Sequence, residues 1–121
     1  MRFTQDHQWI QLDGDLATLG VTAYAAERLG DVIEVAQPAA GQALSVGEAM
    51  ARLEGVNARS DLTAPIDGLV VEANEALPGE PDLINVGPET LGWLVRLKPS
   101  DPKQVEALMD RTAYEAYLDS L

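Results

Sequence analysis

Few residues of this chain could do chemistry by themselves, and their scarcity limits the reactions that it could catalyse. The 121 residues include no cysteine and a single histidine, His7. Disulfides, thiolate nucleophiles, cysteine zinc sites and multi-histidine metal sites are therefore excluded. His7 lies at the start of a predicted strand, where we expect a structural role. What remains is a carboxylate site or a binding module, so we expect that the protein is not an enzyme.

One polar turn stands out as a place that could present a group to a partner. Between Leu53 and Leu62 the chain reads Glu-Gly-Val-Asn-Ala-Arg-Ser-Asp. The stretch before it alternates polar and apolar residues, and the later stretch 69–73 has high strand propensity. We therefore predict a central β-hairpin over 48–73 with Asn57 at or beside its tip, where asparagine tolerates left-handed backbone angles. By themselves, the same residues also fit an ordinary surface turn.

A small β-rich scaffold is predicted around this hairpin. Asp13-Gly14 forms a tight turn between the first two strands. Thr22 caps a short helix over 23–29, and Gly30 ends that helix. Trp93 is expected to pack on a sheet. The other predicted strands are 8–12, 16–21, 32–35, a brief one within 41–48, and 92–98.

Helices are predicted at the C-terminal end, at about 101–121. Pro102 suits the first turn of a helix, where its missing N–H costs nothing. Thr112-x-x-Glu115 has the pattern of a capping box and predicts the start of the last helix. An apolar stripe at i, i+3, i+4 and i+7 predicts that this helix packs on the sheet. The stripe consists of Tyr114, Tyr117, Leu118 and Leu121.

Composition narrows the class of partner. The formal net charge is −12, from 20 acidic and 8 basic residues, and such a surface repels nucleic acids and anionic membranes. No apolar run approaches the roughly 20 residues that a membrane-spanning helix needs, and the N-terminus lacks the apolar core of a signal peptide. We expect a cytoplasmic protein with one domain over 1–121. The acidic surface could steer the chain toward basic docking patches or could serve solubility alone.

The polar turn and the residues after it resemble the lipoyl-attachment hairpin of the glycine cleavage system H protein. The family pattern is roughly Glu-Ser-Val-Lys-Ala-Ala-Ser-Asp, followed by Leu-x-Ala-Pro-x-x-Gly. The stretches 20–31 and 92–98 also resemble this family, so the likeness covers nearly the whole chain. The chain departs from the pattern at Gly55, Asn57 and Arg59. It matches at Glu54, Val56, Ala58, Ser60, Asp61, Leu62, Ala64, Pro65 and Gly68.

This resemblance implies a mainly β fold, a barrel-sandwich hybrid of the lipoyl-domain type with a short helix in the N-terminal half and C-terminal helices. It also implies a Leu-Ile-Asn strand at 83–85. The implied function is a carrier that shuttles the aminomethyl group of glycine on a lipoyl arm. Its implied partners are the pyridoxal-phosphate glycine decarboxylase, the aminomethyltransferase, dihydrolipoyl dehydrogenase and the lipoate-attaching enzyme.

The decisive departure is Asn57, which stands where the family carries the lysine that forms an amide with lipoate. A carboxamide cannot replace that amine, so we expect no lipoate on this chain. By resemblance, Glu54, Val56 and Asp61 flank the attachment position as recognition residues. The chain has only two lysines, Lys98 and Lys103. Neither lies in a predicted hairpin tip or has the Glu-x-Val-Lys surroundings.

Three hypotheses follow. The chain could be a glycine cleavage carrier in a form that has Asn57 in place of lysine. It could instead be an H-like paralogue that has lost the arm and serves partner enzymes as a docking, regulatory or scaffold protein; the further departures at Gly55 and Arg59 favour this slightly. An unrelated small β interaction domain fits the extent of the likeness least. A biotinyl carrier fails because its hairpin also needs a lysine.

Overall fold

Two antiparallel β-sheets form the framework of the protein, and the computed structural model describes residues 1–121. The smaller sheet contains β4 (Val32–Ala36), β6 (Ala49–Gly55) and β7 (Arg59–Thr63), with β6 in the middle. The larger sheet contains, in order across it, β1 (Arg2–Phe3), β2 (Gln8–Asp13), β3 (Leu16–Val21), β9 (Val95–Pro99), β8 (Gly68–Ala73) and β5 (Ala43–Leu44).

A core of 20 buried residues joins the two sheets. The larger sheet contributes Leu19 and Leu97, the smaller sheet contributes Leu53, and all three are fully buried. Apolar side chains from both inner faces share this core, as in a β-sandwich. The predicted mainly β sandwich is therefore confirmed. The helices are α1 (Ala23–Leu29), α2 (Leu83–Val86), α3 (Lys103–Glu106) and α4 (Arg111–Asp119), and none is long and apolar enough to span a membrane.

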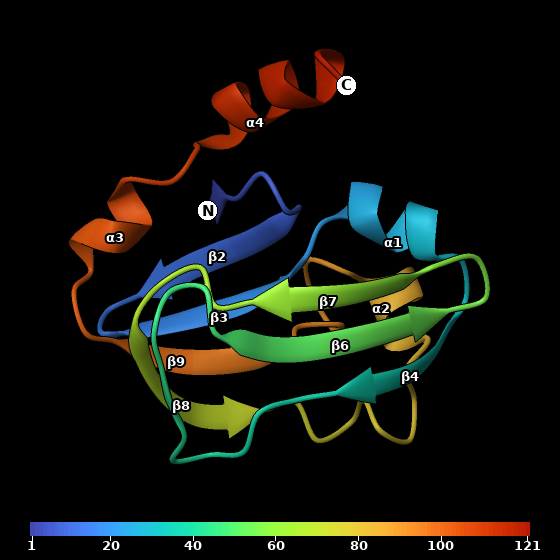
Figure 1. The fold of residues 1–121 in the computed structure, drawn as a ribbon, viewed down its shortest axis with the longest axis horizontal. Helices are drawn as coiled ribbons and strands as arrows, with labels where there is room; N and C mark the ends of the chain where they lie inside the picture. The colour runs from blue at the N-terminus through green and yellow to red at the C-terminus, as the bar shows by residue number, and fades with distance from the viewer.

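The predicted first hairpin and the capped helix that follows it are confirmed. Strands β2 and β3 pair from Gln8 opposite Val21 to Asp13 opposite Leu16. Thr22 caps α1, because its hydroxyl accepts a hydrogen bond from the Ala25 N–H. Helix α1 then packs at one end of the sheets, beside α2 and the turn between β6 and β7 (Figure 1).

The predicted hairpin over 48–73 is wrong in its second arm. Strand β6 pairs with β7, and β8 pairs instead with β9 and β5 in the larger sheet. The chain crosses between the sheets at Ala64-Pro65-Ile66, where Pro65 has no N–H to give to a ladder and Ile66 is fully buried. Strand β7 looked like a turn because Arg59, Ser60 and Asp61 are polar, which suits a strand at the edge of a sheet.

Two further expectations need correction. The stretch 83–85 forms the single-turn helix α2 rather than a strand, with backbone hydrogen bonds from Val86 N to Asp82 O and from Gly87 N to Leu83 O. Helix α4 is capped by Asp110 rather than by the Thr112 box. The Asp110 carboxylate accepts a hydrogen bond from Ala113 N at 2.8 Å, which starts the helix earlier.

Tyr114 makes the main contacts that hold helix α4, and the predicted apolar stripe contributes less. The Tyr114 ring stacks on Phe3 with centroids 4.7 Å apart, and its hydroxyl lies 2.8 Å from both the Thr22 hydroxyl and His7 Nδ1. Tyr117 and Leu118 are partly buried around this cluster. Leu121 is 63% exposed, so the predicted stripe stops one turn early.

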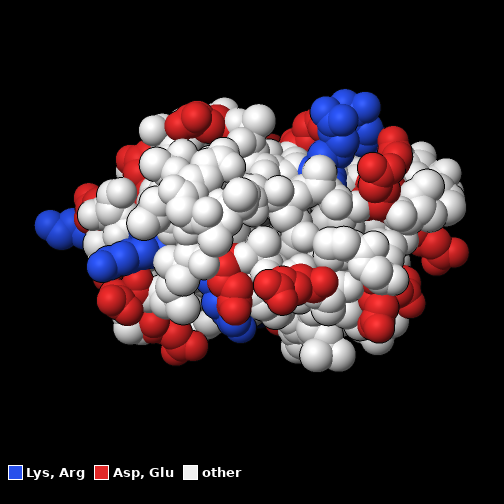
Figure 2. All heavy atoms as spheres, turned by 90° about the horizontal axis from the view of Figure 1, so that it is seen from below, with Lys and Arg blue, Asp and Glu red and all other residues white.

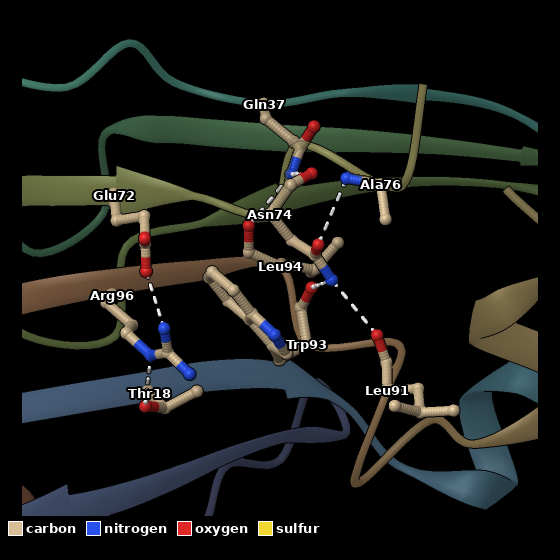
Figure 3. Close-up of polar contacts among 9 residues, drawn as sticks. All are labelled: Thr18, Gln37, Glu72, Asn74, Ala76, Leu91, Trp93, Leu94 and Arg96. Carbon is tan, nitrogen blue, oxygen red and sulfur yellow. Dashed lines mark hydrogen bonds and ion pairs between the residues drawn. The ribbon is translucent and has the colours of Figure 1, made fainter. Parts of the chain in front are cut away.

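The long loop between β8 and β9 is organised by Asn74 (Figure 3). Its amide group donates hydrogen bonds to the carbonyl oxygens of Leu91 and Trp93 and accepts one from Ala76 N. Because Asn74 is buried, these bonds satisfy polar atoms that would otherwise destabilise the fold. Trp93 is partly buried and lies against the Arg96 guanidinium, 4.0 Å from the ring centre.

Replacing Tyr114 with phenylalanine should lower the free energy of unfolding by roughly 1–3 kcal/mol, because the buried Thr22 hydroxyl and His7 lose their shared partner. Urea denaturation would measure this change. Tyr117→Phe is the matched control, since that hydroxyl is exposed and its bond to Gln5 O is 3.3 Å long. The control should change stability by less than about 0.5 kcal/mol. Equal losses in the two variants would contradict the assignment.

Candidate functional site

The predicted site residue Asn57 lies at the tip of the β6–β7 hairpin, where it was expected. The tip is the three-residue turn Val56-Asn57-Ala58, and all three residues are exposed. A hydrogen bond of 2.9 Å from Gly55 N to Ala58 O closes the turn. Val56 projects an apolar side chain that is 62% exposed. The tip therefore offers residues 56–58 to any partner that approaches this end of the molecule.

Backbone contacts dock the tip on the end of helix α1. Val56 N donates to Asp31 O at 2.9 Å, and Asn57 N donates to Leu29 O at 3.0 Å. A Cβ atom at Gly55 would overlap the Leu29 carbonyl group, so only glycine fits this approach without movement. Gly30 has φ +71°, and a Cβ there would lie 2.6 Å from the Asn57 amide nitrogen. Glycines at both contact points therefore let the two backbones meet.

Asn85 of the α2 turn supports the segment beneath the tip. Its amide group donates to Gly30 O at 2.8 Å, and its carbonyl oxygen accepts from Val32 N at 2.9 Å. These bonds fix the chain where α1 ends and β4 begins. The sequence alone did not indicate this support, because Asn85 is more than 50 residues away from both partners.

The predicted flanking residues Glu54 and Asp61 lie on the two arms of the hairpin. In the β6–β7 register Glu54 is opposite Arg59 and Arg52 is opposite Asp61, so all four side chains share one face. The Asp61 carboxylate accepts hydrogen bonds from Arg59 at 3.3 Å and Arg52 at 3.0 Å. These two bonds, that of Arg59 first, hold the pKa of the Asp61 carboxyl below its usual range. All three groups are largely exposed, so the pairing adds little stability.

His7 lies behind the tip in a left-handed backbone conformation with φ +64°. Its ring contacts Tyr24 at a centroid distance of 4.4 Å and is hydrogen-bonded to the Tyr114 hydroxyl. Burial lowers the His7 pKa, and the nearby Arg28 charge lowers it further, whereas Asp6 opposes the shift. These contacts fit the structural role expected from the sequence.

Neither lysine lies near the tip. Lys98 is exposed in β9, opposite Leu69 of β8. Lys103 opens α3, which lies at the other end of the sheets (Figure 1). The structure also has no group of three or more histidine, aspartate or glutamate side chains arranged to hold a metal ion. The sequence and the structure therefore indicate the same candidate site, which is the hairpin tip with its flanking residues.

The contact between Gly55 and helix α1 predicts a specific cost for a small side chain at this position. Gly55→Ala should lower the free energy of unfolding by about 1–3 kcal/mol, as expected when a packed contact is overfilled. It should also speed hydrogen exchange at the Asn57 amide, because the tip must move away from Leu29. Gly79→Ala is the matched control, since a Cβ there meets nothing within 4 Å. Unchanged stability and Asn57 exchange in Gly55→Ala would contradict the docked tip.

Comparison with known proteins identifies the family. The sequence profile of the family described as glycine cleavage H-protein matches residues 1–121. The glycine cleavage system H protein of Phenylobacterium zucineum is 51% identical over 118 residues, covering 98% of each chain. That of Caulobacter vibrioides is 50% identical over 121 residues, covering all of both chains.

The fold agrees with this match. A crystal structure of a glycine cleavage system H protein from Mycobacterium marinum superposes with a TM-score of 0.87 at 34% identity, covering 98% of this chain and 95% of that one. This likeness confirms the predicted barrel-sandwich fold of the lipoyl-domain type. Proteins of this family are lipoyl carriers and are not themselves enzymes. The chain therefore belongs to the glycine cleavage H-protein family.

Proposed function

We propose that this chain is an H-type carrier scaffold of the glycine cleavage system whose attachment position is occupied by Asn57 and therefore carries no lipoyl arm in this form. The observation that supports this proposal is the position of Asn57 at an exposed hairpin tip, within a sequence that resembles the family's attachment motif. Glu54, Val56 and Asp61 would then form the surface that a lipoate-attaching enzyme meets.

The residues at the tip do not fit covalent lipoate. Attachment needs a nucleophilic amine, and the Asn57 amide nitrogen shares its lone pair with its own carbonyl group. No lysine lies within the hairpin, and both lysines of the chain belong to other elements. We therefore assign no aminomethyl-transfer step to this chain as it stands.

The proposed partners are the enzymes that serve an H protein: glycine decarboxylase, the aminomethyltransferase, dihydrolipoyl dehydrogenase and a lipoate-attaching enzyme, all in the cytoplasm. Charge supports docking on basic surfaces, because the net charge is −12. Acidic side chains are scattered over the face in Figure 2 rather than gathered in one patch. A spread of this kind favours long-range attraction over a single charged contact.

A second candidate function is a docking or regulatory paralogue that never carries an arm. Gly55 supports it, because the resemblance places serine at this position and the present backbone approach leaves no room for a side chain. Position 59 also departs from the pattern, and its arginine now pairs with Asp61. The departures at Gly55, Asn57 and Arg59 lie together at one tip, which supports a change of the whole attachment hairpin rather than of residue 57 alone.

Restoring the amine separates the two candidates. Asn57→Lys, incubated with a lipoate-protein ligase and lipoate, should gain one lipoyl group in its intact mass, whereas the native chain should gain none. Ala58→Lys is the matched control and should stay unmodified, because it moves the amine one residue along the turn. Lipoylation of the native chain would overturn the proposal that Asn57 prevents attachment.

Failure of Asn57→Lys alone would favour the paralogue. The double variant Asn57→Lys, Arg59→Ala then tests whether Arg59 has damaged recognition, and it keeps Gly55 because a side chain there would overlap the Leu29 carbonyl group. A gain of lipoyl mass only in the double variant would show that Arg59 prevents recognition of the tip.

Docking should not require the arm. Titration of glycine decarboxylase with the native chain and with unmodified Asn57→Lys should give dissociation constants that agree within about twofold, because the sandwich provides the contact surface. Added salt should weaken both to the same extent, since exposed charges are screened. Absence of binding by the native chain would contradict both the carrier scaffold and the docking paralogue.

A further inference from the structure

The chain contains two Asp-Gly pairs, Asp13-Gly14 and Asp67-Gly68, and their surroundings differ. Aspartate isomerises most readily when glycine follows it, because glycine has no side chain to hinder the attack of its nitrogen on the aspartate carboxyl group. The residue types alone would therefore make the two pairs equally reactive. Any difference between them in the folded protein must come from the structure.

Asp13 and Gly14 lie at the tight turn that joins β2 to β3. Asp13 is opposite Leu16 in the last pair of the ladder, and Gly14 has φ +62°. Both residues of the pair are exposed, and a Cβ atom placed on Gly14 would meet nothing within 4 Å. The Gly14 N–H makes no backbone hydrogen bond. The attacking nitrogen is therefore free, and there is room for a ring to form around it.

The Asp13 carboxylate is also unconstrained. It accepts none of the hydrogen bonds that carboxylates receive in this structure, and no ion pair includes it. Extended backbone keeps a carboxyl carbon away from the next nitrogen, so the end of β2 must open before these two atoms can meet. Only the terminal pair with Leu16 has to separate, and the exposed end of a hairpin opens at a low free-energy cost.

Asp67-Gly68 is fixed by hydrogen bonds and by burial. The Asp67 carboxylate accepts hydrogen bonds from Val46 N at 2.7 Å and from the Gln104 amide at 2.8 Å, and Asp67 N donates to Gln104 Oε1 at 2.8 Å. The first two bonds, that of Val46 first, hold the pKa of the Asp67 carboxyl below its usual range, so less of it is in the protonated form that can lose an OH group. Gly68 is buried, and a Cβ there would lie 2.8 Å from a backbone oxygen of β9. Ring closure at this pair would require all these contacts to break together.

We propose that Asp13 is a site of spontaneous isoaspartate formation in the folded protein, and that the contacts of Asp67 protect it from the same reaction. The Gly14 nitrogen forms a bond to Asp13 Cγ, and the carboxyl OH leaves as water with the proton of that nitrogen. Water then opens the resulting succinimide ring. Attack at Cγ restores aspartate, whereas attack at the main-chain carbonyl carbon gives isoaspartate, in which the main chain runs through Cγ. One water molecule leaves and one enters, so no other reactant is needed.

This modification goes beyond the proposed carrier function, because the β2–β3 turn and the β6–β7 tip lie at opposite ends of the sheets (Figure 1). Isoaspartate adds one carbon to the main chain and therefore disrupts the pairing of Asp13 with Leu16. The docking of the tip on α1 involves none of these atoms and should be unchanged. The free carboxylate of an exposed isoaspartate is accessible to the class of methyltransferase that esterifies it with the methyl group of S-adenosylmethionine.

Prolonged incubation of the native chain in neutral buffer made with oxygen-18 water tests the proposal. Peptide mapping by mass spectrometry with electron-transfer fragmentation distinguishes isoaspartate from aspartate at each position, and every ring opening adds one oxygen-18 atom. Methylation by a protein isoaspartyl methyltransferase gives an independent count. We expect isoaspartate to form at least about tenfold faster at Asp13 than at Asp67, because local opening is easier at the turn. Equal rates at the two positions, or no isoaspartate at Asp13, would overturn the inference.

Unfolding and two variants decide whether the fold causes the difference. In urea that unfolds the chain, the two rates should become similar, and a persistent excess at Asp13 would overturn the role assigned to the structure. Asp13→Glu keeps the charge but would need a larger ring, so it should abolish the reaction at position 13 and leave the rate at Asp67 unchanged. Gln104→Ala removes two hydrogen bonds from Asp67 and should raise the rate there several-fold. An unchanged rate at Asp67 in Gln104→Ala would contradict the proposed protection.

Discussion

The approach of one backbone to another, at the junction of the hairpin tip and the end of helix α1, is the constraint on which the site depends. Two N–H groups of the tip donate to carbonyl oxygens of Leu29 and Asp31. Because backbone atoms make this contact, Gly55 must have no side chain, while the side chains of residues 56–58 remain exposed. A two-stranded hairpin that projected alone would be marginally stable. Docking therefore gives the tip a fixed position and leaves its chemistry to the side chains.

Contacts between residues far apart in the sequence hold α1, and therefore the tip, in this position. Thr22 caps α1 and also bonds to the Tyr114 hydroxyl, which in turn reaches His7. On the other side, Asn85 holds the segment between α1 and β4. The N-terminal loop, α1, the α2 turn and the C-terminal helix thus meet at one end of the sandwich. A change in the packing of α4 is expected to reach the tip through α1, because the Tyr114 hydroxyl contacts the Thr22 cap of that helix.

Local signals predicted the elements that sequence neighbours determine. The β2–β3 hairpin and the Thr22-capped helix followed from residues within a few positions of one another, and the family resemblance supplied the sandwich. The error over 48–73 has a different cause, since strand pairing there depends on partners far away in the sequence. Strand β7 is a polar edge strand that pairs with β6 before the chain crosses between the sheets at Pro65. Strand β8 then pairs with β9 in the larger sheet. The start of α4 shows the converse, because a local acceptor, the Asp110 carboxylate, caps the helix in place of the expected Thr112 box.

Only the contiguous part of the candidate site could be predicted from the sequence. Asn57 and its flanking acids stand out in the sequence because motif residues are contiguous, whereas the docking surface of the tip combines residues 29–31 with residue 85. The structure also separates what each departure from the motif changes. Position 57 determines whether an arm can be attached, because its side chain is exposed while its N–H keeps the tip in place. Position 55 determines how closely the tip approaches α1, and position 59 sets the charge beside it. A lysine at position 57 would therefore project from a tip that its own backbone already holds, so the loss of the arm and the preservation of the carrier fold are physically independent.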